Sequence, residues 1–387
     1  MKLAKLSVLL WSASLVNSRS VEMQDANQVI INNPPEDSEP LCHLEFANGE
    51  TQWVTNAEKW QIKKSGQFFM DITNYSSYDE PIPLPSPTYP TSVFQKPAIT
   101  PLLQHLNKTN LQTNLEHLTS FHNRWYNSIH GEASFHWLLS TILSTIASTG
   151  AHLHGITAHP FPHSFGRQPS IVVRIPGRTN STVVVGAHQD SVNHADPMNG
   201  RAPGADDDGS GTVTILEVLR VMLSDENLVK GSAERAIEFH WYAAEEGGLL
   251  GSLEVWEEYR SRGVDVKGML QQDMTGFWNK TIEETKEFGL MMDVVDKPLM
   301  EYVKLIIEEY TDLPWVETSC GPQCGSDHMS AIKAGYPGVF VIEGAFEYTD
   351  KHLHGIDDLI EYLDYDHMID HAKMTLSFLY ELAFVKF

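Results

Sequence analysis

Basic residues are scarce in this sequence. Its 387 residues include 27 Lys and Arg against 51 Asp and Glu, which gives a formal net charge of −24 at pH 7. A surface with this balance repels the phosphates of nucleic acids and of anionic lipids, so we expect no nucleic-acid partner and no membrane partner. The length and the ordinary apolar content allow one large α/β domain with a smaller appendage.

Long hydrophobic runs are also absent, since no apolar stretch reaches the roughly 18 residues that a transmembrane helix needs. The shorter stretch Leu6–Val16 follows Lys2 and Lys5 and precedes Asn17 and Ser18, where a signal peptidase would cut. We therefore expect residues 1–18 to be a signal peptide and the protein to be secreted and extracellular. A buried amino-terminal helix is the alternative.

Cysteine is rare as well, with only Cys42, Cys320 and Cys324. In an oxidising compartment the close pair can form a disulfide, which leaves Cys42 odd unless the segment that carries it is removed. In the cytosol a Cys-x3-Cys run could instead be half of a metal site. Four Asn-x-Ser/Thr triplets fit a secreted glycoprotein, and their asparagines are Asn74, Asn107, Asn180 and Asn279.

The residues that follow the signal peptide are polar and acidic up to about residue 80. A short structured region is expected between Leu44 and Ile72, and the proline-rich residues 81–87 should form an extended linker that proteases can reach. We interpret residues 19–88 as a propeptide that ends in this linker, and residues 89–387 as the catalytic domain. A small permanent amino-terminal domain is the alternative.

Beyond the linker, helical and strand patterns alternate. Apolar residues at helical spacing predict helices, and short β-branched runs predict strands between them. The expected helices are 102–119, 133–149, 211–223, 298–310 and 365–384. The expected strands are 171–175, 182–187, 236–242, 268–272 and 339–342. This alternation predicts an α/β fold with three α/β/α layers, in which helices cover both faces of a mixed, mostly parallel sheet.

Acidic and imidazole side chains follow several of the predicted strands. His188, Glu245, Glu246 and Asp273 stand at strand ends, and the acidic run 206–208 occupies a turn that enters the next helix. Ligands bind at the carboxyl ends of strands in open α/β sheets. Helix capping and solvated surface pairs are the structural alternatives for each motif alone. Crowded carboxylates repel one another, however, and coexist most readily with cations between them.

Imidazole and carboxylate ligands without thiolate suit zinc. Two such ions that share a carboxylate and a bridging water form a hydrolytic centre. In the pair Glu245 and Glu246, one carboxylate could then bind metal while the other takes a proton from the water. Asp190, two residues after His188, could accept the second N–H of that imidazole ring and fix its tautomer.

Five runs resemble the co-catalytic di-zinc leucyl aminopeptidases that fungi and bacteria secrete. The resemblance covers nearly everything from Tyr89 onward, and the layout of signal and propeptide is similar to the fungal branch. The runs that carry it are Gly186–Asp190, Ala202–Gly211, Tyr242–Gly247, Gln272–Thr275 and Lys351–His354.

This resemblance implies two Zn²⁺ ions per chain. By it, His188 and Asp273 would hold one ion, Glu246 and His354 the other, and Asp207 would bridge them. Glu245 would be the general base and then the acid that protonates the leaving amine. Asp190 and Asp208 would support the ligands, and the peptide bond Asp207–Asp208 would be cis.

The resemblance also implies an apolar pocket for the first side chain of the substrate, with ordinary core packing as the alternative. Its residues would be Met274, Phe340, Ile342, Phe346 and Leu353. We therefore predict a secreted, monomeric zinc aminopeptidase. It would use a metal-bridging water to release Leu-like residues from peptides with a free amino terminus. Its propeptide would either aid folding or inhibit the enzyme. A glutaminyl-cyclase-like enzyme, a carboxypeptidase-like enzyme and a non-catalytic binding protein are the alternatives.

One run departs from the family pattern. The related enzymes carry a tyrosine between two bridged cysteines, on the side of the substrate carbonyl, whereas residues 321–323 contain none. Gln323 could substitute; loss of one such donor costs about 3 kcal/mol of transition-state stabilisation. Nine histidines between His105 and His163 follow no ligand pattern, and we assign them no role.

Overall fold

The computed structural model describes residues 39–75, 87–281, 286–321 and 324–385. The predicted signal peptide and nearly all of the proline-rich linker lie outside these ranges. The chain divides into two units, Met1–Glu39 and Pro40–Phe387. The helices and strands that follow all belong to the second unit.

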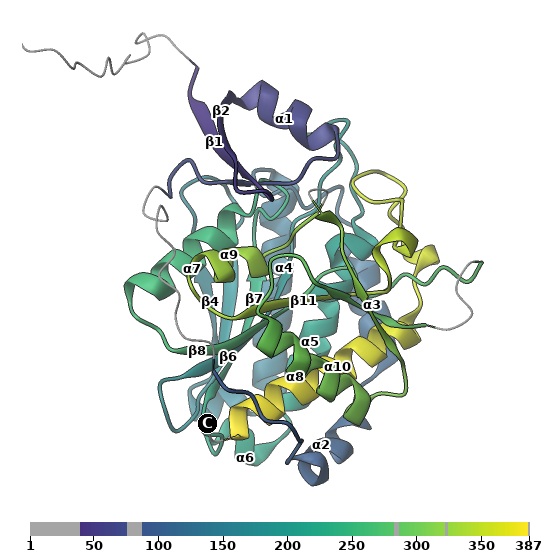
Figure 1. Cartoon of the computed structure of the whole chain (residues 1–387). Coiled ribbons are helices and arrows are strands. Elements are labelled where there is room, and N and C mark those ends of the chain that lie inside the picture. The colour runs from purple at the N-terminus through teal and green to yellow at the C-terminus, as the bar shows by residue number, and fades with distance from the viewer. Residues whose placement is uncertain (1–38, 76–86, 282–285, 322–323, 386–387) are drawn as a thin grey trace, which may run out of the picture. The chain divides into compact units, whose positions relative to one another are not determined.

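An eight-stranded mixed sheet forms the centre of this unit (Figure 1). The strand order is β10-β9-β11-β8-β6-β7-β5-β4, and the four neighbours β11, β8, β6 and β7 run parallel. The strands are β4 (Ala158–Phe161), β5 (Ser170–Ile175), β6 (Thr182–His188), β7 (Ala236–Tyr242), β8 (Val266–Gln272), β9 (Phe288–Met291), β10 (Trp315–Thr318) and β11 (Gly338–Ile342). The predicted α/β fold with a mostly parallel sheet is confirmed.

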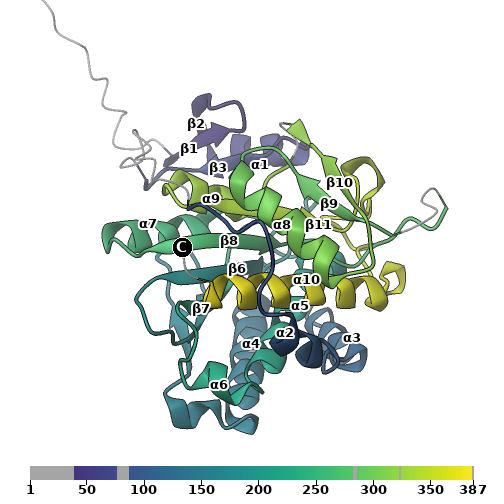
Figure 2. The ribbon, with the colours of Figure 1, turned by 60° about the horizontal axis from the view of Figure 1, so that its bottom comes forward.

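Helices cover both faces of the sheet (Figure 2). On one face lie α4 (Ile129–Ser148), α5 (Gly211–Met222), α8 (Lys297–Tyr310) and α10 (Tyr365–Phe384), with α2 (Lys96–Leu103) and α3 (Lys108–Leu118) outside them. On the other face lie α7 (Leu250–Ser261) and α9 (His328–Lys333). The short helix α6 (Glu226–Val229) precedes β7.

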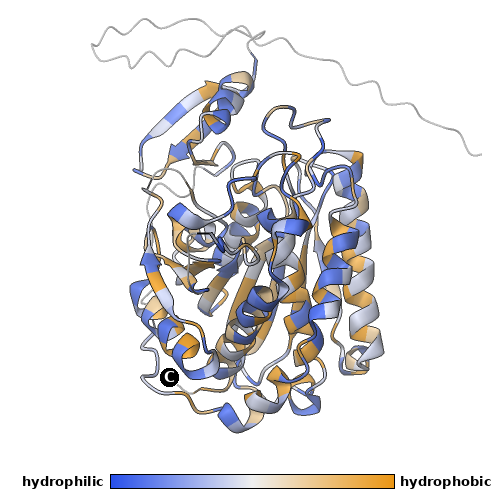
Figure 3. Cartoon of the chain, turned by 90° about the vertical axis from the view of Figure 1, so that its right-hand side faces the viewer, coloured by the Kyte–Doolittle hydropathy of each residue, from blue (hydrophilic) through white to orange (hydrophobic). Residues whose placement is uncertain are grey.

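The central strands are buried on both sides, which explains why they read as apolar runs without alternation. In β6, Val183 and Val185 pack into the larger apolar cluster with α5 and α10, while Val184 packs with α7 and α9 on the opposite face. Figure 3 shows mostly hydrophobic central strands between helices that carry both hydrophilic and hydrophobic residues. Within the described ranges, no helix combines the length and the apolar composition that crossing a bilayer requires.

One predicted helix, 102–119, is wrong. The structure has two helices there, α2 and α3, because the chain leaves helical geometry after Leu103 and a new helix begins at Lys108. The side chain of Asn107 caps α3 by accepting a hydrogen bond from the backbone N–H of Thr109 at 2.8 Å. The apolar spacing continues across this break, which hid it from pattern analysis. The elements β4, β9, β10, α6, α7 and α9 were not predicted.

The region between Leu44 and Ile72 is structured, as expected. It contains β1 (Leu41–Phe46), β2 (Thr51–Thr55), α1 (Asn56–Lys64) and β3 (Phe69–Asp71), and the three strands form an antiparallel sheet in the order β2-β1-β3. We call residues 41–75 the amino-terminal segment. Within the second unit, it contacts the residues around the large sheet through a hydrogen bond from Asp71 N–H to Gly248 O at 2.9 Å and an ion pair between Lys333 and Glu45 at 2.5 Å.

The long helix α4 offers a test of local capping. The buried hydroxyl of Ser128 accepts a hydrogen bond from Gly131 N–H at 2.9 Å and donates one to Asn123 at 2.8 Å. We expect Ser128→Ala to lower the free energy of unfolding by about 1–2 kcal/mol, since both partners lose a bond. Urea denaturation followed by circular dichroism measures this. Ser148→Ala, at the exposed end of the same helix, should change it by less than about 0.5 kcal/mol, and equal effects would contradict the capping role.

Candidate metal centre

The parallel strands β6, β7 and β8 bring the predicted site residues together. β6 lies between the other two, so their carboxyl ends meet at one edge of the sheet. His188 is the last residue of β6, Glu245 and Glu246 follow β7, and Asp273 follows β8. Each of these side chains is buried. Residues far apart in sequence therefore share one small volume.

Asp207 lies between two histidines. It belongs to the turn η3 (Ala205–Ser210), and its peptide bond to Asp208 is cis, as the resemblance implied. Its Oδ1 atom is 3.0 Å from Nε2 of His188, and its Oδ2 atom is 2.9 Å from Nε2 of His354. Burial raises the pKa of Asp207, but these two histidines hold it well below the usual value. The two oxygens of this carboxylate thus face two different imidazoles.

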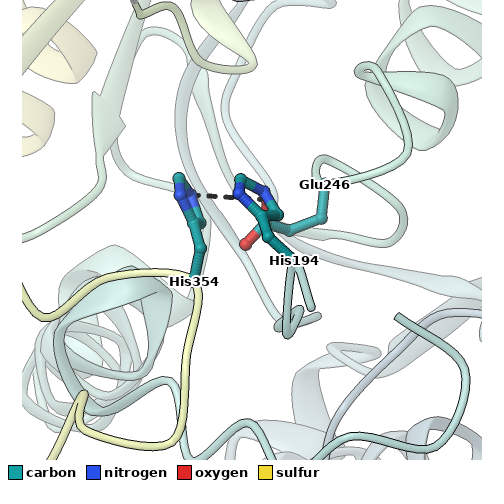
Figure 4. A group of neighbouring side chains, drawn as sticks. All are labelled: His194, Glu246 and His354. Carbon is teal, nitrogen blue, oxygen red and sulfur yellow. Dashed lines mark ion pairs between the residues drawn. The ribbon is translucent and has the colours of Figure 1, made fainter. Parts of the chain in front are cut away.

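Two groups of potential ligands surround Asp207. In the first, ligand atoms of His188, Asp207 and Asp273 all lie within 4.8 Å of one another. In the second, the same holds for His194, Glu246 and His354, whose side chains point toward one another in Figure 4. Nε2 of His354 is 3.6 Å from Oε2 of Glu246, and Nε2 of His188 is 3.6 Å from Oδ1 of Asp273.

Several buried polar atoms at this edge make no well-formed hydrogen bond to a described residue. They are both ring nitrogens of His188, both carboxylate oxygens of Glu246, and Oδ1 of Asp273. Buried polar atoms are almost always paired, and a buried carboxylate without a partner is costly. Divalent cations would meet this need, and oxygen and imidazole donors suit zinc. The residues present therefore fit the two zinc ions that the sequence predicted.

Asp208 and Asp190 hold the backbone around these groups. Asp208 accepts hydrogen bonds from the N–H groups of His188 at 3.0 Å and Gly211 at 2.8 Å. Asp190 accepts from Glu245 N–H at 3.1 Å and Glu246 N–H at 3.2 Å.

The predicted bond of Asp190 to the ring of His188 is longer than an ordinary hydrogen bond, since its oxygen is 3.5 Å from Nδ1. The shorter contacts of Asp190 are those to the backbone of the two glutamates. Its carboxylate therefore ties the end of β6 to the turn after β7.

Three supporting residues were missed by sequence reasoning. Asp358 accepts the backbone N–H groups of Asp206 at 2.8 Å and Asp207 at 3.1 Å. The buried guanidinium of Arg124 donates to Gln189 O at 2.8 Å, to Gly204 O at 2.8 Å and to Pro203 O. Ser326 donates its hydroxyl hydrogen to Asp273 at 2.6 Å. No local pattern connects these residues with partners 53 to 152 positions away.

Left-handed backbone geometry occurs three times beside the ligands. Ala244, Met274 and His354 have φ angles of 57°, 59° and 56°. Such a conformation costs a non-glycine residue about 1–3 kcal/mol and persists where the surroundings enforce it. The fold thus accepts backbone strain at the positions that aim Glu245, Asp273 and the His354 ring.

A cavity of about 220 Å³ opens beside these ligands. Glu245, only 6 % exposed, lines it together with Asp207, Asp273 and His354. Burial raises the pKa of Glu245 well above its usual value, against the opposing effect of Lys63 and His188. The five predicted apolar pocket residues all line the same cavity: Met274, Phe340, Ile342, Phe346 and Leu353.

The disulfide Cys320–Cys324 is present and packs against Phe340 and Ile342 of the cavity wall. Residues 322 and 323, and with them Gln323, lie outside the described ranges. Of the predicted glycosylation sites, Asn74, Asn107 and Asn180 are exposed, and Asn279 is half-buried.

The amino-terminal segment reaches into this cavity. Lys63, near the end of α1, is 8 % exposed, and its Nζ atom lies 3.2 Å from Oε2 of Glu246. Burial lowers the pKa of Lys63, but Glu246 and Glu245 more than offset this and raise it. Phe68 and Gln67 also line the cavity. Sequence analysis did not foresee an ammonium group among the proposed ligands.

Several known proteins are similar to this chain. The model of the family described as Peptidase family M28 matches residues 170–379. Leucine aminopeptidase 1 of Neurospora crassa is 49% identical over 395 residues, covering 100% of this chain and 98% of the relative. The Grosmannia clavigera protein of the same name is 52% identical over 351 residues, 89% of this chain and 86% of the relative.

A solved structure shows the same fold. The LapA aminopeptidase of Legionella pneumophila superposes with a TM-score of 0.75 at 25% identity, covering 90% of this chain and 95% of that structure.

Asp358 should stabilise the turn that presents Asp207. Asp358→Ala would leave two buried backbone N–H groups without an acceptor, so we expect a loss of about 2–4 kcal/mol in unfolding free energy and faster loss of zinc to a chelator. Thermal denaturation and timed zinc release measure both. The exposed neighbour Asp357 provides the control substitution Asp357→Ala, which should leave both values unchanged. Zinc release at the parent rate from Asp358→Ala would contradict this role.

Proposed function

The chain belongs to peptidase family M28 and is a zinc-dependent aminopeptidase, and we propose that it releases apolar, Leu-like residues from the amino termini of peptides. The observation that carries this proposal is the position of Asp207 between two histidines, with Glu245 at the same cavity. His188 and Asp273 would hold one zinc ion, and Glu246 and His354 the other, with Asp207 shared. When bound, the ions would polarise the peptide carbonyl and activate water for attack.

Glu245 is the proposed proton carrier. Its carboxylate would accept a proton from the attacking water and then deliver that proton to the leaving amine. The raised pKa of Glu245 suits a group that must both take and give a proton near neutral pH. Its neighbour Glu246 faces His354 instead, which leaves Glu245 free for this role.

The cavity accounts for the proposed substrate class. Its acidic wall attracts a free α-amino group, and Lys63 already places an ammonium group 3.2 Å from Glu246. The apolar wall, with Phe340 and Ile342 from β11, suits an aliphatic side chain. An ammonium that must pair with this wall limits cleavage to the first peptide bond.

Three alternatives remain open to experiment. A cyclase that acts on amino-terminal glutamine, a carboxypeptidase and a non-catalytic binding protein could share this fold. The full set of five ligands and the buried Glu245 favour hydrolysis with two metals. The absence of a tyrosine from residues 321–323 affects only the carbonyl side of the site, so it bears on rate more than on reaction type.

We propose that residues 1–18 direct secretion, that residues 19–88 are a propeptide, and that cleavage near the proline-rich linker releases a monomeric enzyme modified at its exposed sequons. The contact of Lys63 with Glu246 supports inhibition by the propeptide. An ammonium at a proposed metal ligand opposes both metal and substrate. Before cleavage, the amino-terminal segment therefore keeps peptides from the cavity.

The first test is hydrolysis of leucine p-nitroanilide by the processed protein, with zinc counted in the same samples. Glu245→Ala should lower kcat by about 10²–10⁴-fold with two zinc ions retained, since it removes a proton carrier and no ligand. Glu246→Ala serves as the comparison, because it should lose zinc as well as activity. A Glu245→Ala variant that keeps parental kcat would show that another group moves the proton.

The role of Lys63 is testable in the uncleaved chain. Lys63→Met removes the ammonium but keeps a side chain of similar length, so leucine p-nitroanilide turnover should rise at least about tenfold. Mass spectrometry verifies that each sample is uncut. Lys64→Met removes the same charge from an exposed neighbour that also lines the cavity, and it should have little effect because the ion pair with Glu246 is made by Lys63. Equal activity of the parent, Lys63→Met and the processed enzyme would rule out inhibition by this contact.

A further inference from the structure

His194 stands among the proposed ligands although the sequence pattern assigned it no role. It follows β6 by six residues, and one of its ring nitrogens lies within 4.8 Å of ligand atoms of both Glu246 and His354 (Figure 4). It also lines the substrate cavity. Its position therefore raises the question of what its imidazole binds.

The loop that carries His194 is fixed to the segment that carries His354. The backbone N–H of His194 donates to His354 O at 3.0 Å, and the two rings stack with centroids 4.1 Å apart at an interplanar angle of 26°. Asn193 braces the same loop, since its side chain accepts from Ala195 N–H at 2.9 Å and donates to Arg201 O at 2.8 Å. The imidazole is thus held in place before any ion binds.

Buried polar atoms of His194 and Glu246 lack hydrogen-bond partners. Nε2 of His194 is buried and has no hydrogen-bond partner among the described residues, and Oε1 of Glu246 has none either, while Oε2 of Glu246 lies 3.2 Å from Nζ of Lys63. Within the described ranges, His328, His367 and His371 also have one buried ring nitrogen without such a partner, so His194 is distinguished by its place beside Glu246 and His354. A cation beside Glu246 would give His194 and Glu246 a shared partner.

We propose that His194 is a further protein donor to the ion that Glu246 and His354 hold. This inference rests on the proposed two-metal function and makes its two sites unequal. The ion beside Glu246 has four protein donors, with Asp207 and His194 included, whereas the ion beside His188 has three. Zinc sites with four protein ligands are typically closed, and sites with three keep a position for substrate or water. The ion beside Glu246 is therefore the more tightly held.

The test is cobalt binding by the full-length chain that carries Lys63→Met, so that no ammonium competes with the ion beside Glu246; metal is first removed with a chelator. His194→Phe keeps an aromatic ring to stack on His354 but removes the nitrogen donors, and His194→Leu removes both. In the parent we expect two unequal binding constants in chelator competition. In both variants the tighter constant should weaken by at least about 10–100-fold and the visible absorption of that site should change, with the other constant nearly unchanged.

The matched control is His117→Phe, because His117 is another stacked histidine, with its ring centroid 4.6 Å from that of Trp137 and outside both ligand groups. It should leave cobalt binding unaltered. Lys63→Met is the background of every protein compared, the parent included, so the proteins differ only at the substituted histidine. Circular dichroism checks that each variant is folded.

Two results would overturn the proposal. Unchanged binding constants and spectra in both His194 variants would mean that the ring only stacks. A raised KM for leucine p-nitroanilide with unchanged cobalt binding would mean that His194 contacts the substrate instead. Binding of a single cobalt ion by the parent would contradict the two-metal function itself, and the effect of His194→Phe on that one constant would still decide whether His194 is a ligand.

Discussion

Repulsion between buried carboxylates is the constraint on which the rest of this site depends. Asp207, Glu245, Glu246 and Asp273 all lie at one edge of the sheet, at most 7 % exposed. Charges packed this closely in a medium of low dielectric cannot all persist without positive charge between them. Histidines, the ammonium of Lys63 and the proposed zinc ions supply it.

The fold meets this constraint with backbone hydrogen bonds. Asp190 and Asp208 accept N–H groups from the chain around the ligands, and Asp358 accepts two more from the turn that carries Asp207. Arg124 ties the preceding loop to the same turn through carbonyl oxygens. These contacts hold the acidic side chains close together although they repel one another. The left-handed φ angles beside the ligands show that the surrounding structure holds the backbone in an unfavourable conformation.

The sequence alone predicted those features that depend on neighbouring residues. The strands β6, β7 and β8 were predicted from apolar runs, and their polar end residues marked the edge at which His188 and Asp273 meet. The resemblance added His354, which spacing could not. The break at Asn107 was missed because apolar periodicity runs through it, and a single capping side chain decides the outcome.

Residues whose partners lie far away in the sequence could not be predicted from local patterns. Lys63, Arg124, His194 and Asp358 become part of the site only when loops and helices distant in sequence pack together. Asp358 and Asp207 are 151 positions apart. A sequence motif contains information about residues close together in the chain, whereas these contacts depend on how the entire chain folds. Asp190 is an intermediate case, since its position was predicted but its main partners are backbone groups.

The spacing of the ligands along the chain also orders events in time. His188 leaves the ribosome long before His354, and at about 5–20 residues per second the interval between them is roughly 10–30 s. During that interval one proposed ion lacks its histidine and Asp207 faces only one imidazole. A nascent chain that lacks His354 is therefore missing one of the five proposed ligands, and the two-metal site can be completed only after nearly the whole chain has been made.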